Sequence, residues 1–213
     1  MSEYLTDDEQ VERIKKWWSE NGSSVIAGLV IGFGLLGGWR FYVDYKENVA
    51  AEASAHFSDM LTAVQSSKHD DAIQQANVLL EEYSTTVYAD LARLSLAKAF
   101  VETGKYDQAE QQLQLLVDNA AESSLQMVAR TRLAAVMFQQ QKMSQALEVL
   151  DVSYPDQFAA AFEELKGDIL AAQGDKQRAR EAYQKAQLAQ PPAPDTQFLQ
   201  QKLEDLGMSV VAS

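Results

Sequence analysis

The sequence contains one run of nineteen residues, Asn21 to Trp39, in which no side chain carries a charge. As a helix rising about 1.5 Å per residue, this run would span roughly 28 Å, close to the ~30 Å hydrocarbon core of a bilayer. Its glycines would weaken a helix in water but are tolerated in lipid. We therefore predict a transmembrane helix over residues 23–40 rather than a buried helix of a soluble domain. Aromatic residues flank it where the headgroups would lie: Trp17, Trp18, Trp39, Phe41, Tyr42 and Tyr45.

The residues around this run indicate whether the helix is retained and how it is oriented. The first twenty residues are mostly acidic, unlike the short basic start of a signal peptide, and we expect a retained anchor. Three basic residues precede the span and two follow it, while residues 41–213 hold 14 basic against 25 acidic side chains. The positive-inside rule then predicts a cytoplasmic N-terminus and a C-terminal domain across the membrane.

Residues 1–22 are predicted to form a cytoplasmic amphipathic head. Thr6 and Glu9 fit a capping box at a helix start, and Val11, Ile14 and Trp18 then recur at helical spacing. Such a stripe suits a helix that lies on the inner surface of the bilayer. The alternative, in which these residues simply extend the membrane helix, stays open.

After the span the pattern is continuously helical, without the alternation of strands, so we predict an all-α fold. Four segments share a helix, a short polar turn and a small alanine followed by large apolar residues. The shared alanines are Ala72, Ala109, Ala146 and Ala179, at separations of 37, 37 and 33 residues. This period is typical of stacked two-helix repeats, and the segments resemble a tetratricopeptide array of about four repeats over residues 53–190.

Several residues in this array have predictable packing roles. Gly104 and Gly174 suit the tight turns between paired helices, whereas Gln141 stands where glycine is usual. Gly167 would allow close packing of the first helix in the last repeat. Residues 41–52 are expected to continue the membrane helix as a stalk. A proline-rich stretch then breaks the helical pattern at residue 191. Residues 191–213 are predicted to form a capping helix and a tail, with Asp195 or Thr196 as the N-cap of the helix and Gly207 at its end.

Two surfaces could bind partners. In the span, small residues one helical turn apart could dock another membrane helix: Ser24, Gly28, Gly32, Gly34 and Gly38. The alternative is the general glycine enrichment of membrane helices. The first helices of two stacked repeats could line a concave groove for a peptide, through Leu91, Leu94, Lys98, Val101, Val128, Thr131, Ala135 and Phe138. The alternative is that these side chains pack against neighbouring helices.

The composition offers little for catalysis, cofactors or metals. The chain has no cysteine and two histidines, and its paired carboxylates, such as Asp70 and Asp71, point to different sides of a helix. The net charge of −13 opposes nucleic-acid binding, which requires a basic surface. We therefore expect no catalytic, cofactor-binding or metal-ligating residues and a non-enzymatic protein.

The whole chain resembles the YfgM family of bacterial inner-membrane proteins, most specifically at QVERIKKWWSENGSSVIAGLVIGFGLLGGWRFY. This resemblance implies a single-pass anchor in the lipid bilayer of the inner membrane and a periplasmic repeat domain. It also implies association with the SecYEG translocon and with the periplasmic chaperone PpiD, in the handling of unfolded exported proteins. The alternative function is a membrane-tethered scaffold for another envelope or division complex.

Overall fold

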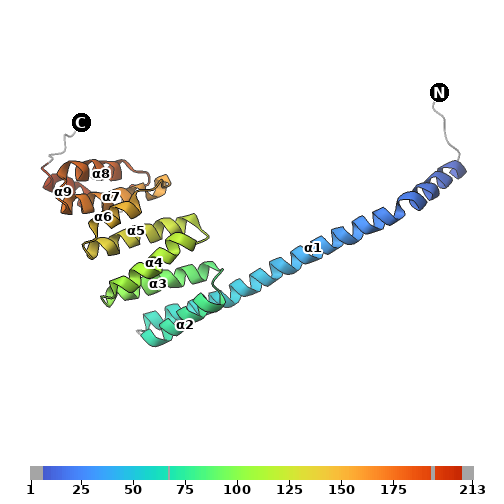
Figure 1. Cartoon of the computed structure of the whole chain (residues 1–213), viewed down its shortest axis with the longest axis horizontal. Helices are drawn as coiled ribbons and strands as arrows, with labels where there is room; N and C mark the ends of the chain where they lie inside the picture. Colours follow the sequence, from blue (N-terminus) through green and yellow to red (C-terminus); the bar gives the residue numbers. More distant parts are fainter. Residues whose placement is uncertain (1–6, 67, 193–194, 208–213) are drawn as a thin grey trace, which may run out of the picture. The chain divides into compact units, whose positions relative to one another are not determined.

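The computed structural model describes residues 7–66, 68–192 and 195–207, and it divides the chain into two compact units, Met1–Glu52 and Ala53–Ser213. All regular structure in the described residues is helical, which confirms the all-α prediction. Helix α1 (Asp7–Gln65) contains the uncharged run and contributes residues to both units. Figure 1 shows the helices in chain order by colour.

Among the described residues, α1 is the one helix whose length and apolar composition would allow it to cross a membrane. The head and the uncharged run belong to this same helix. Thr6, the expected N-cap, lies outside the described residues. The large apolar side chains of the run are exposed, among them Ile31, Phe33 and Leu35. An apolar, uncharged surface of this kind suits lipid rather than water.

The second unit is a series of helical pairs. The last turns of α1, from Ala53, pack on α2, and each later pair joins a first helix to a second helix through a short turn. The helices are α2 (His69–Glu82), α3 (Val87–Glu102), α4 (Tyr106–Asn119), α5 (Ser123–Gln139), α6 (Met143–Leu150), α7 (Asp156–Ala172), α8 (Lys176–Leu188) and α9 (Thr196–Asp205). Helices α3, α5 and α7 are the first helices, and α2, α4, α6 and α8 are the second helices.

The register of the repeated alanines reappears in the packing. Ala109, Ala146 and Ala179 are fully buried, because a methyl group is the largest side chain that the close approach of two paired helices accepts. Gly104 and Gly174 have φ values of 73° and 83°, the left-handed region that favours glycine. Gln141 takes the same conformation with φ of 62°, although its side chain makes that conformation costly.

A polar contact across each of the first three pairs repeats with a spacing of nineteen residues. His56 Nδ1 lies 2.8 Å from Gln75 Oε1, and the Arg93 guanidinium donates to Gln112 Oε1 at 3.1 Å. In the next pair Arg130 donates to the Val149 carbonyl at 3.4 Å. Burying a polar side chain costs free energy unless it finds a hydrogen-bond partner. These contacts supply such partners, so they help to fix how each first helix is aligned with its second helix.

The last pair is the most tightly joined. A Cβ atom added at Gly167 in α7 would overlap the ring of Tyr183 in α8, which confirms that glycine is needed there for close packing. Tyr154, ahead of α7, donates to the buried carboxylate of Glu163. Burial and this hydrogen bond raise the pKa of Tyr154.

Helix α9 closes the array with buried Leu199 and Leu203. The Asp195 carboxylate accepts from the Phe198 amide at 2.9 Å and is therefore the N-cap, as one of the two expected candidates. Gly207 follows the helix with φ of 83°, and the expected loose tail after it lies outside the described residues.

Candidate functional site

The small residues of the membrane segment lie on the surface of the first unit. Ser24, Gly28, Gly34 and Gly38 are exposed, and Gly32 is half-buried. A Cβ atom built at any of the four glycines would meet no atom within 4 Å. The glycines are thus not required by packing within the chain, and they leave room for the backbone of another helix to approach closely.

The first helices of the second unit pack beside one another, since α3 contacts α5 and α5 contacts α7. The structure sorts the eight residues expected on this face into three kinds. Lys98, Val101 and Ala135 are exposed. Leu91, Val128, Thr131 and Phe138 are half-buried, and three of these pack against the central core. Leu94 is 7% exposed and belongs to that core, so it offers almost no surface to a ligand.

Two exposed apolar residues extend this face into the first pair and were missed from the sequence. Leu61 is 39% exposed and Val64 is 50% exposed, both in the last turns of α1. They precede Lys98 and Val101 by the same 37 residues that separate Ala72 from Ala109, so the repeat register could have identified them. We call the surface of Leu61, Val64, Lys98, Val101, Ala135 and Phe138 the first-helix surface.

The first-helix surface changes character at the last pair. Glu164 and Asp168 of α7 both accept hydrogen bonds from Lys202 of α9, at 2.8 and 2.9 Å. Burial alone would lower the pKa of Lys202, but the hydrogen bonds to the two carboxylates raise it. Helix α9 thus pairs both carboxylates at the acidic end of the face with one half-buried ammonium group.

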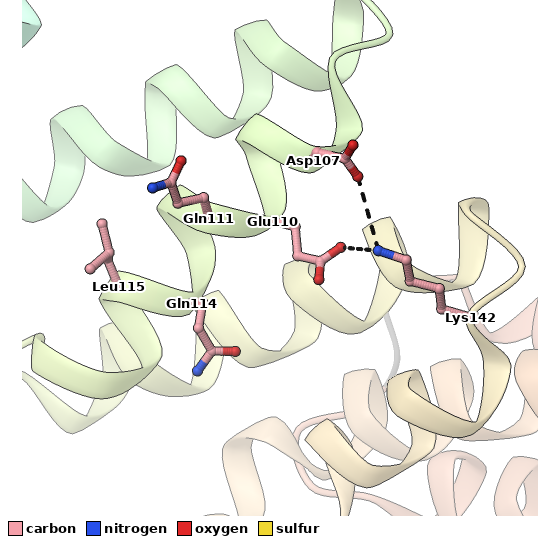
Figure 2. Close-up of a pocket in the computed structure, with 6 residues that line it drawn as sticks. All are labelled: Asp107, Glu110, Gln111, Gln114, Leu115 and Lys142. Carbon is pink, nitrogen blue, oxygen red and sulfur yellow. Dashed lines mark hydrogen bonds and ion pairs between the residues drawn. The ribbon is translucent and has the colours of Figure 1, made fainter.

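A second surface feature lies beside α4. A cavity of 340 Å³ is lined by Asp107, Glu110, Gln111, Gln114, Leu115 and Lys142, and we call it the second-helix cavity. Lys142 precedes α6 and reaches across to α4, where its Nζ lies 2.8 Å from Glu110 and 4.0 Å from Asp107 (Figure 2). The hydrogen bond to Glu110 raises the pKa of Lys142.

The arrangement of titratable groups suits packing and ion pairing. Among residues 7–66, 68–192 and 195–207 no group of three or more metal-ligating side chains comes together. The paired carboxylates are used separately: buried Glu163 accepts from Tyr154, and Glu164 accepts from Lys202. The features that could have a function are therefore the small-residue face of α1, the first-helix surface and the second-helix cavity.

Known proteins resemble the chain along most of its length. The family described as tetratricopeptide repeat-like domain matches residues 15–208. An Escherichia coli (strain K12) protein named "Ancillary SecYEG translocon subunit" is 32% identical over 98% of this chain and 100% of its own length. A Haemophilus influenzae protein of the same name is 29% identical over 88% of this chain and 91% of its own.

A solved tetratricopeptide repeat protein from Parabacteroides merdae is similar in structure, with a TM-score of 0.51 at 22% identity. The similarity covers 72% of this chain, and the chain spans 57% of the length of that protein. At this level of identity the likeness supports the repeat fold alone.

Proposed function

Because the chain belongs to the tetratricopeptide repeat-like family of the ancillary SecYEG translocon subunits, we propose that it is a non-enzymatic ancillary subunit of the bacterial Sec translocon. The observation that carries this proposal is the full-length similarity to the Escherichia coli protein of that name, which includes the apolar segment as well as the repeats. The exposed apolar residues of the first-helix surface support a role in binding other proteins.

The proposed location is the inner membrane, with the N-terminus cytoplasmic and the repeat unit periplasmic. The excess of basic residues before the span and the acidic repeat unit favour this orientation. Protease added to spheroplasts should digest residues 53–213 and spare the head. Protection of the repeat unit would reverse the orientation.

Within the membrane, the small-residue face of α1 is proposed to dock against a helix of the translocon. In lipid there is no hydrophobic gain on association, so helices associate where small residues permit close van der Waals contact. Gly28 and Gly32, one helical turn apart, leave such space on one side of α1. Replacing Gly28 and Gly32 with leucine should release the chain from the translocon without unfolding the repeat unit.

Outside the membrane, the first-helix surface is proposed to bind the chaperone PpiD or exported client chains. Val64, Val101 and Phe138 occupy the same position in three successive first helices and offer a line of apolar side chains. Apolar side chains of an extended or helical segment would be buried against them.

Co-purification tests the proposal as a whole. The full chain, tagged and extracted from inner membranes in mild detergent, should recover SecY, SecE and SecG, and a photo-crosslinker at Val101 should capture PpiD or an exported chain. Recovery of a different envelope or division complex in place of the translocon would favour the scaffold alternative and reject the translocon assignment.

A further inference from the structure

Helix α9 covers two carboxylates of the last pair with its own lysine. Glu164 and Asp168 lie one helical turn apart on α7, and Lys202 Nζ donates to them at 2.8 and 2.9 Å. Asp168 follows Ala135 by the same 33 residues that separate the last two register alanines. The covered carboxylates therefore continue the first-helix surface into α7.

The surroundings of this ammonium group form a site for a lysine side chain. The Tyr183 hydroxyl donates to Asp168 at 2.7 Å, and the centre of its ring lies 5.6 Å from Lys202 Nζ. An aromatic ring at this distance attracts a cation, and an ionised carboxylate strengthens the hydrogen bond that it accepts from an ammonium group. The Lys202 side chain is 16% exposed, so the site holds it largely away from water.

The cations beside this site are paired with a different carboxylate. Glu163 is buried, and its carboxylate lies 3.3 Å from Lys166 Nζ and 4.0 Å from Lys185 Nζ. In the part of the chain that the structure describes, Lys202 is the cation that contacts the two covered carboxylates. Without α9, the surface would therefore present two negative charges that no cation of the chain neutralises.

Helix α9 is held less firmly than the two helices of the last pair. It buries two side chains, Leu199 and Leu203, whereas α8 buries four and α7 buries six. Phe198, next to Leu199, is 51% exposed. Segments with few buried apolar side chains open at a lower free energy than the core. Opening of α9 would uncover the carboxylates together with apolar residues that share a cluster with the two leucines, such as Ala182 and Ala186 of α8.

We propose that α9 is a displaceable cover and that the surface beneath it binds an amphipathic helix of a partner protein, with two leucines one turn apart and a lysine beside them. Helix α9 itself identifies this chemistry, because Leu199, Lys202 and Leu203 are the groups that the surface accepts in the structure. The lysine of the partner takes the place of Lys202, so the partner and α9 exclude each other. This inference rests on the proposed role of the first-helix surface in binding other proteins, and it adds a closed and an open state to that role.

Two labelled peptides of about 15 residues test the proposal on the full chain in detergent micelles. The lysine peptide consists of alanine and glutamine, with leucine, lysine and leucine at the spacing of residues 199, 202 and 203. The norleucine peptide has norleucine, which is uncharged and of similar length, in place of the lysine. The Leu199→Asp variant should open the surface, because aspartate would be buried without a partner as long as α9 stayed in place.

The opened variant should bind the lysine peptide about tenfold more tightly than the unmodified chain does, because the affinity of the unmodified chain is reduced by the small fraction of molecules that are open. It should also bind the lysine peptide about tenfold more tightly than the norleucine peptide, since charge-assisted hydrogen bonds are the stronger ones. Adding Asp168→Asn to the opened variant should remove this second difference.

The same helices supply matched controls. Gln197→Asp places the same charge at an exposed position of α9 and should leave the affinity for the lysine peptide as it is in the unmodified chain. Asp156→Asn removes an exposed carboxylate of α7 and should leave the lysine preference of the opened variant intact. Leu203→Asp opens the surface from a second buried position, so the proposal stays testable where Leu199→Asp alters the fold.

Three results would overturn the proposal: no binding of the lysine peptide to either opened variant up to about 1 mM, equal affinity of the opened variants for the two peptides, or equal affinity of opened and unmodified chains for the lysine peptide. Co-recovery of two differently tagged copies that is lost in Leu199→Asp would assign the surface to α9 of a second copy and would also overturn it. Recovery of the translocon is expected from Leu199→Asp, because α1 is unchanged, so failure of this site and failure of the translocon assignment are told apart.

Discussion

Replacing Gly167 with alanine should destabilise the repeat unit, although the same change in an ordinary helix stabilises it. In an unobstructed helix the alanine would contribute about 1 kcal/mol through its higher helix propensity. At Gly167 the new methyl group would overlap Tyr183 Cε1 and Cδ1 and lie 3.0 Å from Cγ of that ring. The ring is 3% exposed and cannot swing into solvent without opening the core.

The cost can be estimated from the contacts that the methyl group disturbs. Overpacking a close-packed site costs about 1–3 kcal/mol. Displacing Tyr183 also breaks its 2.7 Å hydrogen bond to Asp168, which contributes about 1 kcal/mol. After subtraction of the propensity gain, Gly167→Ala should lower the free energy of unfolding by about 1–3 kcal/mol. The midpoint of thermal unfolding should fall by about 2–4 °C for each kcal/mol.

Urea unfolding of the full chain in detergent, followed by circular dichroism, measures this change. Gly28→Ala is the matched control, because its methyl group meets no atom within 4 Å. Tyr183→Leu should suppress the effect of Gly167→Ala, so that the double variant loses less than the sum of the two single losses. An unchanged or raised stability of Gly167→Ala would refute the assignment of Gly167 as a packing glycine.

Three further predictions concern a turn, the cap and acid stability. Gln141→Gly should raise the free energy of unfolding by about 1 kcal/mol in urea titrations, because glycine adopts the left-handed backbone at φ 62° without strain. Gly104→Ala should lower the free energy of unfolding by a similar amount. The opposite signs would contradict this account of the turns. Lys202→Ala should lower the free energy of unfolding by about 2 kcal/mol and speed hydrogen exchange in α9, because two partly buried carboxylates lose their partner. Unaltered hydrogen exchange in α9 would show that the ammonium group does not hold this capping helix in place. Hydrogen bonds from the Arg178 side chain and backbone lower the pKa of Asp175, so its contribution to stability is present at neutral pH and is lost as the pH falls below 3.8. The difference in the free energy of unfolding between the protein and its Asp175→Asn variant, measured in urea, should therefore shrink on acidification. A difference that does not depend on pH would argue against an ionised Asp175 as the N-cap of α8.

The parts of the fold that follow from local or periodic constraints could be predicted from the sequence. Four alanines at a nearly constant spacing gave the register of the pairs, and three of them are fully buried. The turns at Gly104 and Gly174 could be predicted because glycine is the residue type that adopts a left-handed backbone without strain. The run from Asn21 to Trp39 is constrained by its lack of charge alone, which is why its helix could be predicted before any packing was known.

Features that depend on neighbours distant in the chain could not be predicted in this way. Leu94 and Val101 lie on the same helix at positions expected on one face, yet Leu94 is in the core and Val101 is 36% exposed. The ion pairs of Lys202 join residues 38 and 34 positions apart, and no periodic pattern marks them. The second-helix cavity depends on Lys142, which reaches from the start of α6 to carboxylates 32 or more residues earlier in the chain.

The closing of the array by α9 limits what the first-helix surface can bind. Because Lys202 occupies Glu164 and Asp168, the open apolar positions belong to three helices, at Val64, Val101 and Phe138. Packed helices lie about 8–10 Å apart, so the line across three of them is about 20 Å long. An extended chain covers that distance with about six residues at about 3.3 Å each. A segment so short, held by three apolar positions, requires a few large apolar side chains and no defined sequence, which is compatible with the proposed binding of exported client chains.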